Sequence, residues 1–139
     1  MRAFQLDSGM KTMRGVFYPT DWMVLMFPGE KEARDAARIL GDQGIAEDDL
    51  MLLTPEDFRR DIVGATGDDD MLPSVGTEGD TVRRFAQLAR EGHHGLMVHA
   101  GDHKQAVRVV EMLRDVPISS GQLYRKLVIE DIVDPQAAR

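Results

Sequence analysis

The sequence predicts an α+β domain in which two strand–helix–strand units follow one another. Each unit begins with a short apolar stretch, continues with apolar residues at helical spacing, and ends with a second apolar stretch. The two helical stretches share one apolar pattern, because Ala33 corresponds to Ala106, and Leu40 to Leu113, at the same offset. These observations indicate an internal repeat within a single domain.

The first unit is predicted to occupy residues 21–58. Its first strand is WMVLMF (22–27), which is continuously apolar and is followed by a Pro-Gly pair, as is typical of a buried strand. The next stretch predicts a helix, with charges on one face and four apolar residues on the other. The four are Ala33, Ala36, Ala37 and Leu40. The second strand, DLMLLT (49–54), ends at Pro55.

The second unit is predicted to occupy residues 94–132. Its first strand is GLMVHA (95–100), and Asp102 with Gln105 has the pattern of a helix capping box. The helix after this box carries its apolar residues on one face. They are Ala106, Val109, Val110 and Leu113. QLYRKLVI (122–129) alternates between apolar and polar residues, which predicts an edge strand with one face in water.

Tandem units of this kind favour a ferredoxin-like fold with a four-stranded antiparallel sheet, in which the first and third strands are central. Both central strands are apolar at odd and even positions, so both sheet faces are expected to be covered. The insert between the units (59–93) is predicted to contain a loop from 64 to 79 and a helix from 80 to 91. This helix can cover the second face, and a second subunit is the alternative cover. We expect a homodimer, because symmetric dimers are the commonest assemblies.

The domain is predicted to span residues 21–133. Residues 1–20 show no periodicity and are interpreted as an N-terminal extension. Residues 134–139 are interpreted as a flexible tail.

The composition excludes several classes of function. The chain of 139 residues has 24 acidic and 17 basic side chains, a net charge of −7, which argues against non-specific nucleic-acid binding. It has no cysteine, which excludes disulfides and thiol nucleophiles. Its longest apolar stretch is far shorter than the ~20 residues of a membrane span, so we expect no membrane partner and a cytoplasmic location.

The four histidines lie at the two ends of the strand predicted at 95–100. At a rise of about 3.3 Å per residue, His94 and His99 are about 16 Å apart, which is too far for one metal ion. His99 and His103 flank a strand-to-helix turn, and Asp21 is expected at the same end of the sheet. Two imidazoles and a carboxylate suit a divalent metal ion, so these three residues are the predicted metal site. The alternative is that His99 packs along the sheet and that His103 is a solvated residue of the first helical turn.

His93 and His94 are further candidates for ligand binding. They are expected near the start of the first long helix, whose unpaired backbone amides suit an anion. Glu30 and Glu32 already bring negative charge to that end, which argues against phosphate. The alternative is that both histidines only solvate a helix end. No cofactor is expected besides a divalent metal ion.

Two segments resemble small bacterial general-stress domains of the heat-induced-protein-like kind. The segments are REGHHGLMVHAGDHKQAVRVVEMLRD (90–115) and FPGEKEARDAARILGDQGIAEDDLMLLT (27–54), and the resemblance covers residues 22–115. It implies a bacterial stress-associated protein without established catalysis, and it supplies no catalytic residues. The insert of that family is Gly/Ala-rich, whereas the insert here is acidic and polar, which argues against a role at a membrane.

We therefore expect a non-enzymatic cytoplasmic protein, stress-associated or regulatory, that acts through self-association or a protein partner. One alternative is a sensor of a small ligand or divalent metal that uses a His/Asp site. A further alternative is an enzyme with a cavity on a sheet face, which only fold analogy supports. No catalytic residue is predicted.

Overall fold

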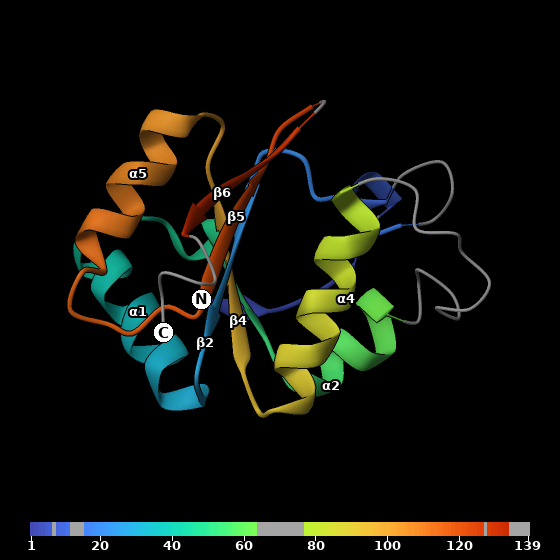
Figure 1. Ribbon diagram of the computed structural model, residues 1–139. Coiled ribbons are helices and arrows are strands. Elements are labelled where there is room, and N and C mark those ends of the chain that lie inside the picture. The colour runs from blue at the N-terminus through green and yellow to red at the C-terminus, as the bar shows by residue number, and fades with distance from the viewer. Residues whose placement is uncertain (7, 12–15, 64–76, 127, 134–139) are drawn as a thin grey trace.

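The computed structural model describes residues 1–6, 8–11, 16–63, 77–126 and 128–133. Most of the loop predicted at 64–79, and the whole tail predicted at 134–139, lie outside these ranges. The described residues form an α+β structure with a six-stranded mixed sheet between two layers of helices (Figure 1).

The sheet has the strand order β1-β3-β4-β2-β5-β6. Its strands are β1 (Arg2–Ala3), β2 (Trp22–Phe27), β3 (Leu50–Leu53), β4 (His94–His99), β5 (Ser120–Tyr124) and β6 (Ile129–Val133). The central pair, β2 and β4, is antiparallel and runs from Trp22 opposite His99 to Phe27 opposite His94. β1 pairs in parallel with β3, and the other neighbours are antiparallel. The prediction of two adjacent apolar central strands is confirmed, but the sheet is wider than the four strands expected.

The strand predicted at 122–129 is instead the middle of a hairpin. β5 ends at Tyr124, and β6 begins at Ile129 and returns antiparallel to β5. The polar pair Arg125 and Lys126 lies in the exposed turn between them. β6 forms the sheet edge, and every residue of β5 is buried, whereas an edge strand with one wet face was expected.

The first sheet face is covered by α1 (Glu30–Asp42) and α5 (His103–Met112), which lie together on one side of the sheet (Figure 1). The repeated apolar residues of the two units meet there. Ala33, Leu40, Ala106 and Leu113 are all buried in one cluster with alternate residues of β2 and β4. The internal repeat therefore explains how one half of the core is packed.

The second face is covered by α4 (Thr77–Arg90) and by α2 (Pro55–Asp57), which continues into the π-helical segment η3 (Phe58–Val63) (Figure 1). Val82 and Phe85 of α4 are buried against Val24 and Met97 of the central strands. Of the two covers that the sequence left open, the structure thus has the insert helix on its own sheet. A homodimer stays a prediction, but this sheet face is not open to a second subunit.

Residues before β2 also contribute to the second face. Phe4, Met10 and Phe17 are buried there, and the ring of Phe17 lies 6.0 Å from that of Tyr124 in β5. These residues, interpreted from the sequence as an extension, belong to the core. The short helices η1 (Ser8–Met10) and η2 (Glu47–Asp49) complete the described elements.

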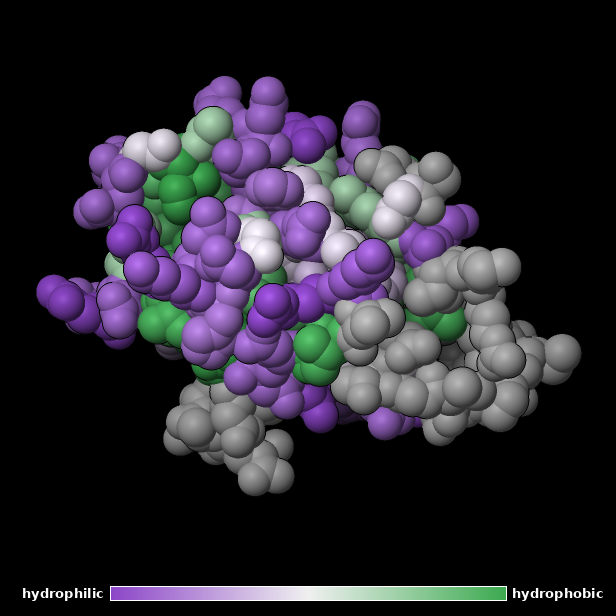
Figure 2. Space-filling view, turned by 90° about the horizontal axis from the view of Figure 1, so that it is seen from above, coloured by the Kyte–Doolittle hydropathy of each residue, from purple (hydrophilic) through white to green (hydrophobic). Residues whose placement is uncertain are grey.

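The outer surface seen from above is mostly hydrophilic, with small separate apolar areas (Figure 2). Among the residues that the structure describes, Val128 in the β5–β6 turn is the one large hydrophobic side chain that is exposed, at 52%. No helix in the described part of the chain is long and apolar enough to cross a membrane.

Candidate functional site

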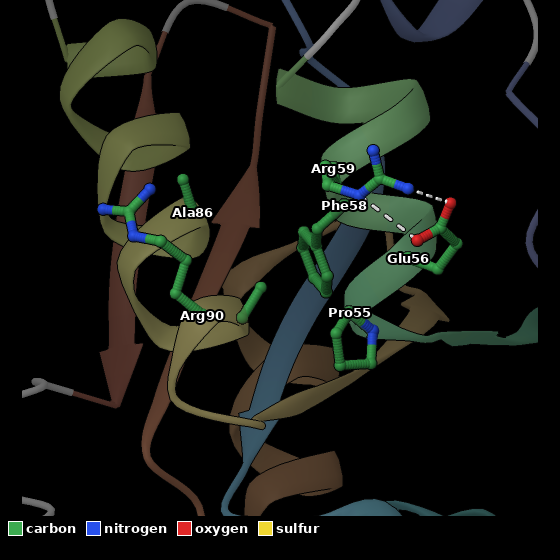
Figure 3. Close-up of a pocket in the computed structure, with 7 residues that line it drawn as sticks. Pro55, Glu56, Phe58, Arg59, Ala86 and Arg90 are labelled. Atoms are coloured by element: carbon green, nitrogen blue, oxygen red, sulfur yellow. Dashed lines mark hydrogen bonds and ion pairs between the residues drawn. The ribbon is translucent and has the colours of Figure 1, made fainter.

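A groove of about 300 Å³ lies between α2–η3 and α4, on the outer side of the second helical layer (Figure 3). We call it the α2–α4 groove. It is lined by Pro55, Glu56, Phe58, Arg59, Ala86, Ala89 and Arg90. Most of these residues present carbon atoms to the groove, and two arginines and one glutamate stand at its rim.

A capping box fixes the α2 wall of the groove. The hydroxyl of Thr54 accepts a hydrogen bond from the backbone N–H of Asp57 at 3.1 Å, and the Asp57 carboxylate accepts one from the backbone N–H of Thr54 at 2.9 Å. Pro55 occupies the first helical position, where its fixed φ suits a helix start. The direction of α2 is therefore set by its own sequence.

Phe58 forms the base of the groove. Its side chain is fully buried, and its ring lies 5.7 Å from the ring of Phe85 in α4, at 55°. Figure 3 shows the Phe58 ring between the two helices, directed from α2–η3 toward α4. The aromatic pair holds the two walls at a fixed separation.

Small side chains on α4 leave the space open. Ala86 and Ala89 are only half-buried, although they lie next to the fully buried Phe85 on the same helix. Larger side chains at these two positions would fill the groove. The volume is thus a consequence of two alanines that face a phenylalanine.

The two rim arginines have different partners. Two nitrogens of Arg59 donate to the two carboxylate oxygens of Glu56, and this ion pair lowers the pKa of Glu56 below its ordinary value. Arg90 instead donates to the neutral side-chain oxygen of Gln87 at 2.9 Å. The rim therefore carries one neutralised arginine and one arginine bound to a neutral partner.

The α2–α4 groove was not predicted from the sequence. The two alanines at a spacing of three, and the aromatic residue after a Pro-Glu-Asp turn, are visible in the sequence. Their meeting depends on where two separate segments cross the sheet, which spacing along the chain does not reveal.

His93 and His94 lie where the sequence predicts, at the end of the sheet near the start of α1. The pKa of Glu30 is lowered, mainly by the hydrogen bond from Arg34 and to a smaller extent by the charge of His94. The Nδ1 atom of His93 lies 3.1 Å from the Leu88 carbonyl oxygen, and that of His94 lies 3.2 Å from the Gly92 carbonyl oxygen. Both histidines thus have a backbone partner at the end of α4, and neither lines the α2–α4 groove.

His99 and Asp21 lie at the opposite end of β4. The backbone carbonyl of Asp21 accepts a hydrogen bond from the N–H of Ala100 at 2.9 Å, and Asp21 has a left-handed φ of 70°. The His99 ring lies 5.1 Å from the Trp22 ring in an edge-to-face arrangement, on the second sheet face. The backbone of Asp21 therefore lies next to the end of β4, as predicted.

His103 contacts a residue that the sequence analysis did not consider. Its Nδ1 atom lies 2.7 Å from a carboxylate oxygen of Glu130 in β6, whose other oxygen accepts a hydrogen bond from Arg125 at 2.9 Å. In the described ranges, no group of three or more His, Asp or Glu side chains is placed to hold a metal ion. The site predicted from His99, His103 and Asp21 stays a prediction.

No protein-family model, no curated protein and no solved structure matches this chain.

Proposed function

We propose that the protein is a non-enzymatic binding protein that takes a small, mostly apolar molecule into the α2–α4 groove. The observation that carries the proposal is an open volume of about 300 Å³ between helices whose positions are fixed by a capping box and an aromatic pair. Ligand sites in proteins typically have volumes of about 300–1,000 Å³ and mostly apolar walls with a few polar groups. The groove lies at the lower end of that range.

The same geometry favours binding over catalysis. Glu56, the carboxylate at the rim, is occupied by two nitrogens of Arg59, and this pairing holds it in the charged form. A general acid or base would need a pKa nearer to neutral. The polar groups of the rim are thus suited to orienting a ligand.

The size of the groove also favours a small ligand over the partner protein expected from the sequence. A stable protein–protein interface buries about 1,200–2,000 Å² and has an apolar core. The face of the molecule seen in Figure 2 is mostly hydrophilic, with small and separate apolar areas, and Val128 is the one exposed large hydrophobic side chain among the described residues. We therefore place recognition in the groove.

We further propose a ferredoxin-like core, formed by β2, β3, β4 and β5 with α1 and α5. The order β3-β4-β2-β5 and the antiparallel pairing of these four strands support this proposal. β1 and β6 are then additions at the two edges. The resemblance of residues 22–115 to bacterial general-stress domains supports a stress-associated, cytoplasmic role for the binding protein.

The proposal is tested with N-phenyl-1-naphthylamine, an uncharged dye whose fluorescence rises in an apolar site. We expect saturable binding to the full chain and a loss of at least tenfold in affinity in Ala86→Leu, because leucine fills the groove. Arg84→Leu is the matched control, since Arg84 is exposed on the same helix and does not line the groove.

Equal loss of affinity in both leucine variants, or no saturable binding to the wild-type chain, would overturn the proposal. Circular dichroism and thermal melting show whether each variant keeps its fold. Ala86→Leu is expected to stay folded, because leucine is a strong helix former at a half-buried position.

A further inference from the structure

We propose that the ligand of the α2–α4 groove carries a carboxylate and that Arg90 binds it. This inference rests on the proposed function and names the ligand class: a small apolar molecule with one carboxylate. It is carried by the different hydrogen-bond partners of the two rim arginines.

Arg59 already binds a carboxylate within the protein. Its Nε atom lies 3.2 Å from one carboxylate oxygen of Glu56, and a second nitrogen bonds the other oxygen. Figure 3 shows the Arg59 guanidinium turned toward Glu56. A ligand carboxylate at Arg59 would have to compete with this two-point ion pair.

Arg90 can exchange its hydrogen-bond partner for a ligand. Its guanidinium donates to the amide oxygen of Gln87 at 2.9 Å, and Gln87 in turn donates to Glu91 at 2.7 Å. A carboxylate can accept two parallel hydrogen bonds from a guanidinium and adds the attraction of opposite charges, neither of which a neutral amide oxygen provides. A ligand carboxylate would therefore replace Gln87 as the better partner of Arg90.

The position of Arg90 suits this role. It lies one residue after Ala89 and one helical turn after Ala86, so its long exposed side chain starts at the apolar wall. The end of α4 also gains stability from a cation in its last turn, and this explains an arginine there without any ligand. Only an arginine that binds the ligand is expected to make a carboxylate bind more tightly than its uncharged analogue.

The ligand is thus matched on two sides. An aliphatic or aromatic body fills the space between Pro55, Ala86 and Ala89 above Phe58. Figure 3 shows the Arg90 guanidinium directed away from Phe58, so this exposed side chain turns toward the groove when it exchanges Gln87 for the carboxylate of the ligand. Among the described residues Arg90 has no carboxylate partner, whereas the charges of Arg59 and Glu56 cancel, so the rim suits a ligand with a single negative charge. It does not suit a dianion or a cation.

The test compares 4-phenylbutyrate with its uncharged isostere 4-phenylbutanamide on the full chain by isothermal titration calorimetry. We expect the carboxylate to bind about tenfold more tightly than the amide at low salt. Arg90→Gln should remove the preference, so that the carboxylate and the amide bind with equal affinity. Arg84→Gln, which removes an exposed arginine outside the groove lining, should keep the preference.

Equal affinity of both compounds for the wild-type chain would overturn the carboxylate inference. If Ala86→Leu then abolished the binding of both compounds, the groove would still be supported as the binding site. A preference that Arg84→Gln removes as strongly as Arg90→Gln would overturn it too, because the effect would then come from the general charge of α4. Failure of both compounds and of the uncharged dye to bind would overturn the proposed function together with this inference.

Discussion

The ring of Phe58 packs directly against the backbone of Gly95 in β4. A Cβ atom on Gly95 would lie 2.9 Å from Cζ of Phe58 and 3.1 Å from Cβ of Leu53. Only a residue without a side chain lets the ring sit this close to the strand. The contact therefore sets the depth of the α2–α4 groove, whose base is Phe58.

Gly95→Ala is expected to lower the free energy of unfolding by about 1–3 kcal/mol, because the added methyl group forces Phe58 or the strand to move. Chemical denaturation measures the change. Gly41→Ala is the control, since no atom lies within 4 Å of its added Cβ and alanine in a helix gains about 1 kcal/mol over glycine. A neutral result at Gly95 would show that the packing of Phe58 is loose.

Thr54→Ala should lower the free energy of unfolding by about 1 kcal/mol, because it removes the capping box that begins α2. It should also weaken dye binding, since α2 is one wall of the groove. Asp102→Ala removes a similar cap from α5, where the Asp102 side chain accepts from the N–H of Gln105 at 2.8 Å. The control should lose similar stability and bind the dye as the wild type does. Equal dye binding by both variants would contradict the role assigned to α2.

Ser120→Ala is expected to raise the free energy of unfolding by about 1 kcal/mol. Ser120 is fully buried in β5, and its hydroxyl oxygen has no hydrogen-bond partner in the part of the chain that the structure describes. An unpaired buried hydroxyl costs about 1–3 kcal/mol, which alanine avoids. Ser119→Ala, at a half-buried position beside it, should change stability by less than about 0.5 kcal/mol. A loss of stability at Ser120 would show that the hydroxyl is satisfied by an ordered water molecule.

The free energy of unfolding is expected to fall in acid, partly because Glu130 in the β5–β6 hairpin becomes protonated. Hydrogen bonds from Arg125 and, to a smaller extent, from His103 lower the pKa of Glu130 below its ordinary value of 4.5. A carboxyl group whose pKa is lowered by folding stabilises the protein above its unfolded pKa, and this contribution is lost as the pH falls through the folded pKa. Because the pair is near the surface, the effect is at most about 1 kcal/mol.

Urea denaturation between pH 7 and pH 3 measures this effect. Glu130→Gln should reduce stability at pH 7 and make its decline in acid less steep. Glu111→Gln, at an exposed site on α5, should keep the slope of the wild type. Identical slopes for wild type and Glu130→Gln would contradict the assigned ion pairs.

Local patterns predicted the central part of the fold well. The apolar run at 22–27 lies where expected, as do the matched helix faces at Ala33 and Ala106. The spacing of apolar residues within a strand or helix predicts which of its faces is buried. The need to cover the second sheet face was also correctly inferred from strands that are apolar on both sides. Such arguments require only the residues of one element.

Features that depend on contacts between distant segments were missed. The hairpin turn at Arg125 interrupts a stretch that alternates like one strand, and Glu130 meets His103 only after β6 folds back. The burial of Phe4 and Phe17 requires the N-terminal segment to cross the sheet, which no periodicity in that segment reveals. The α2–α4 groove is a further example, because it forms where two separate segments of the chain meet on the second sheet face.

Intermolecular NOEs between the phenyl protons of 4-phenylbutyrate and the methyl groups of the protein would show whether the α2–α4 groove takes a small apolar ligand. We predict strong NOEs to the methyl groups of Ala86 and Ala89, which line the groove, and none to that of Ala100, which is buried at the end of β4. NOEs that arise elsewhere on the protein while both groove alanines give none would contradict binding in the groove.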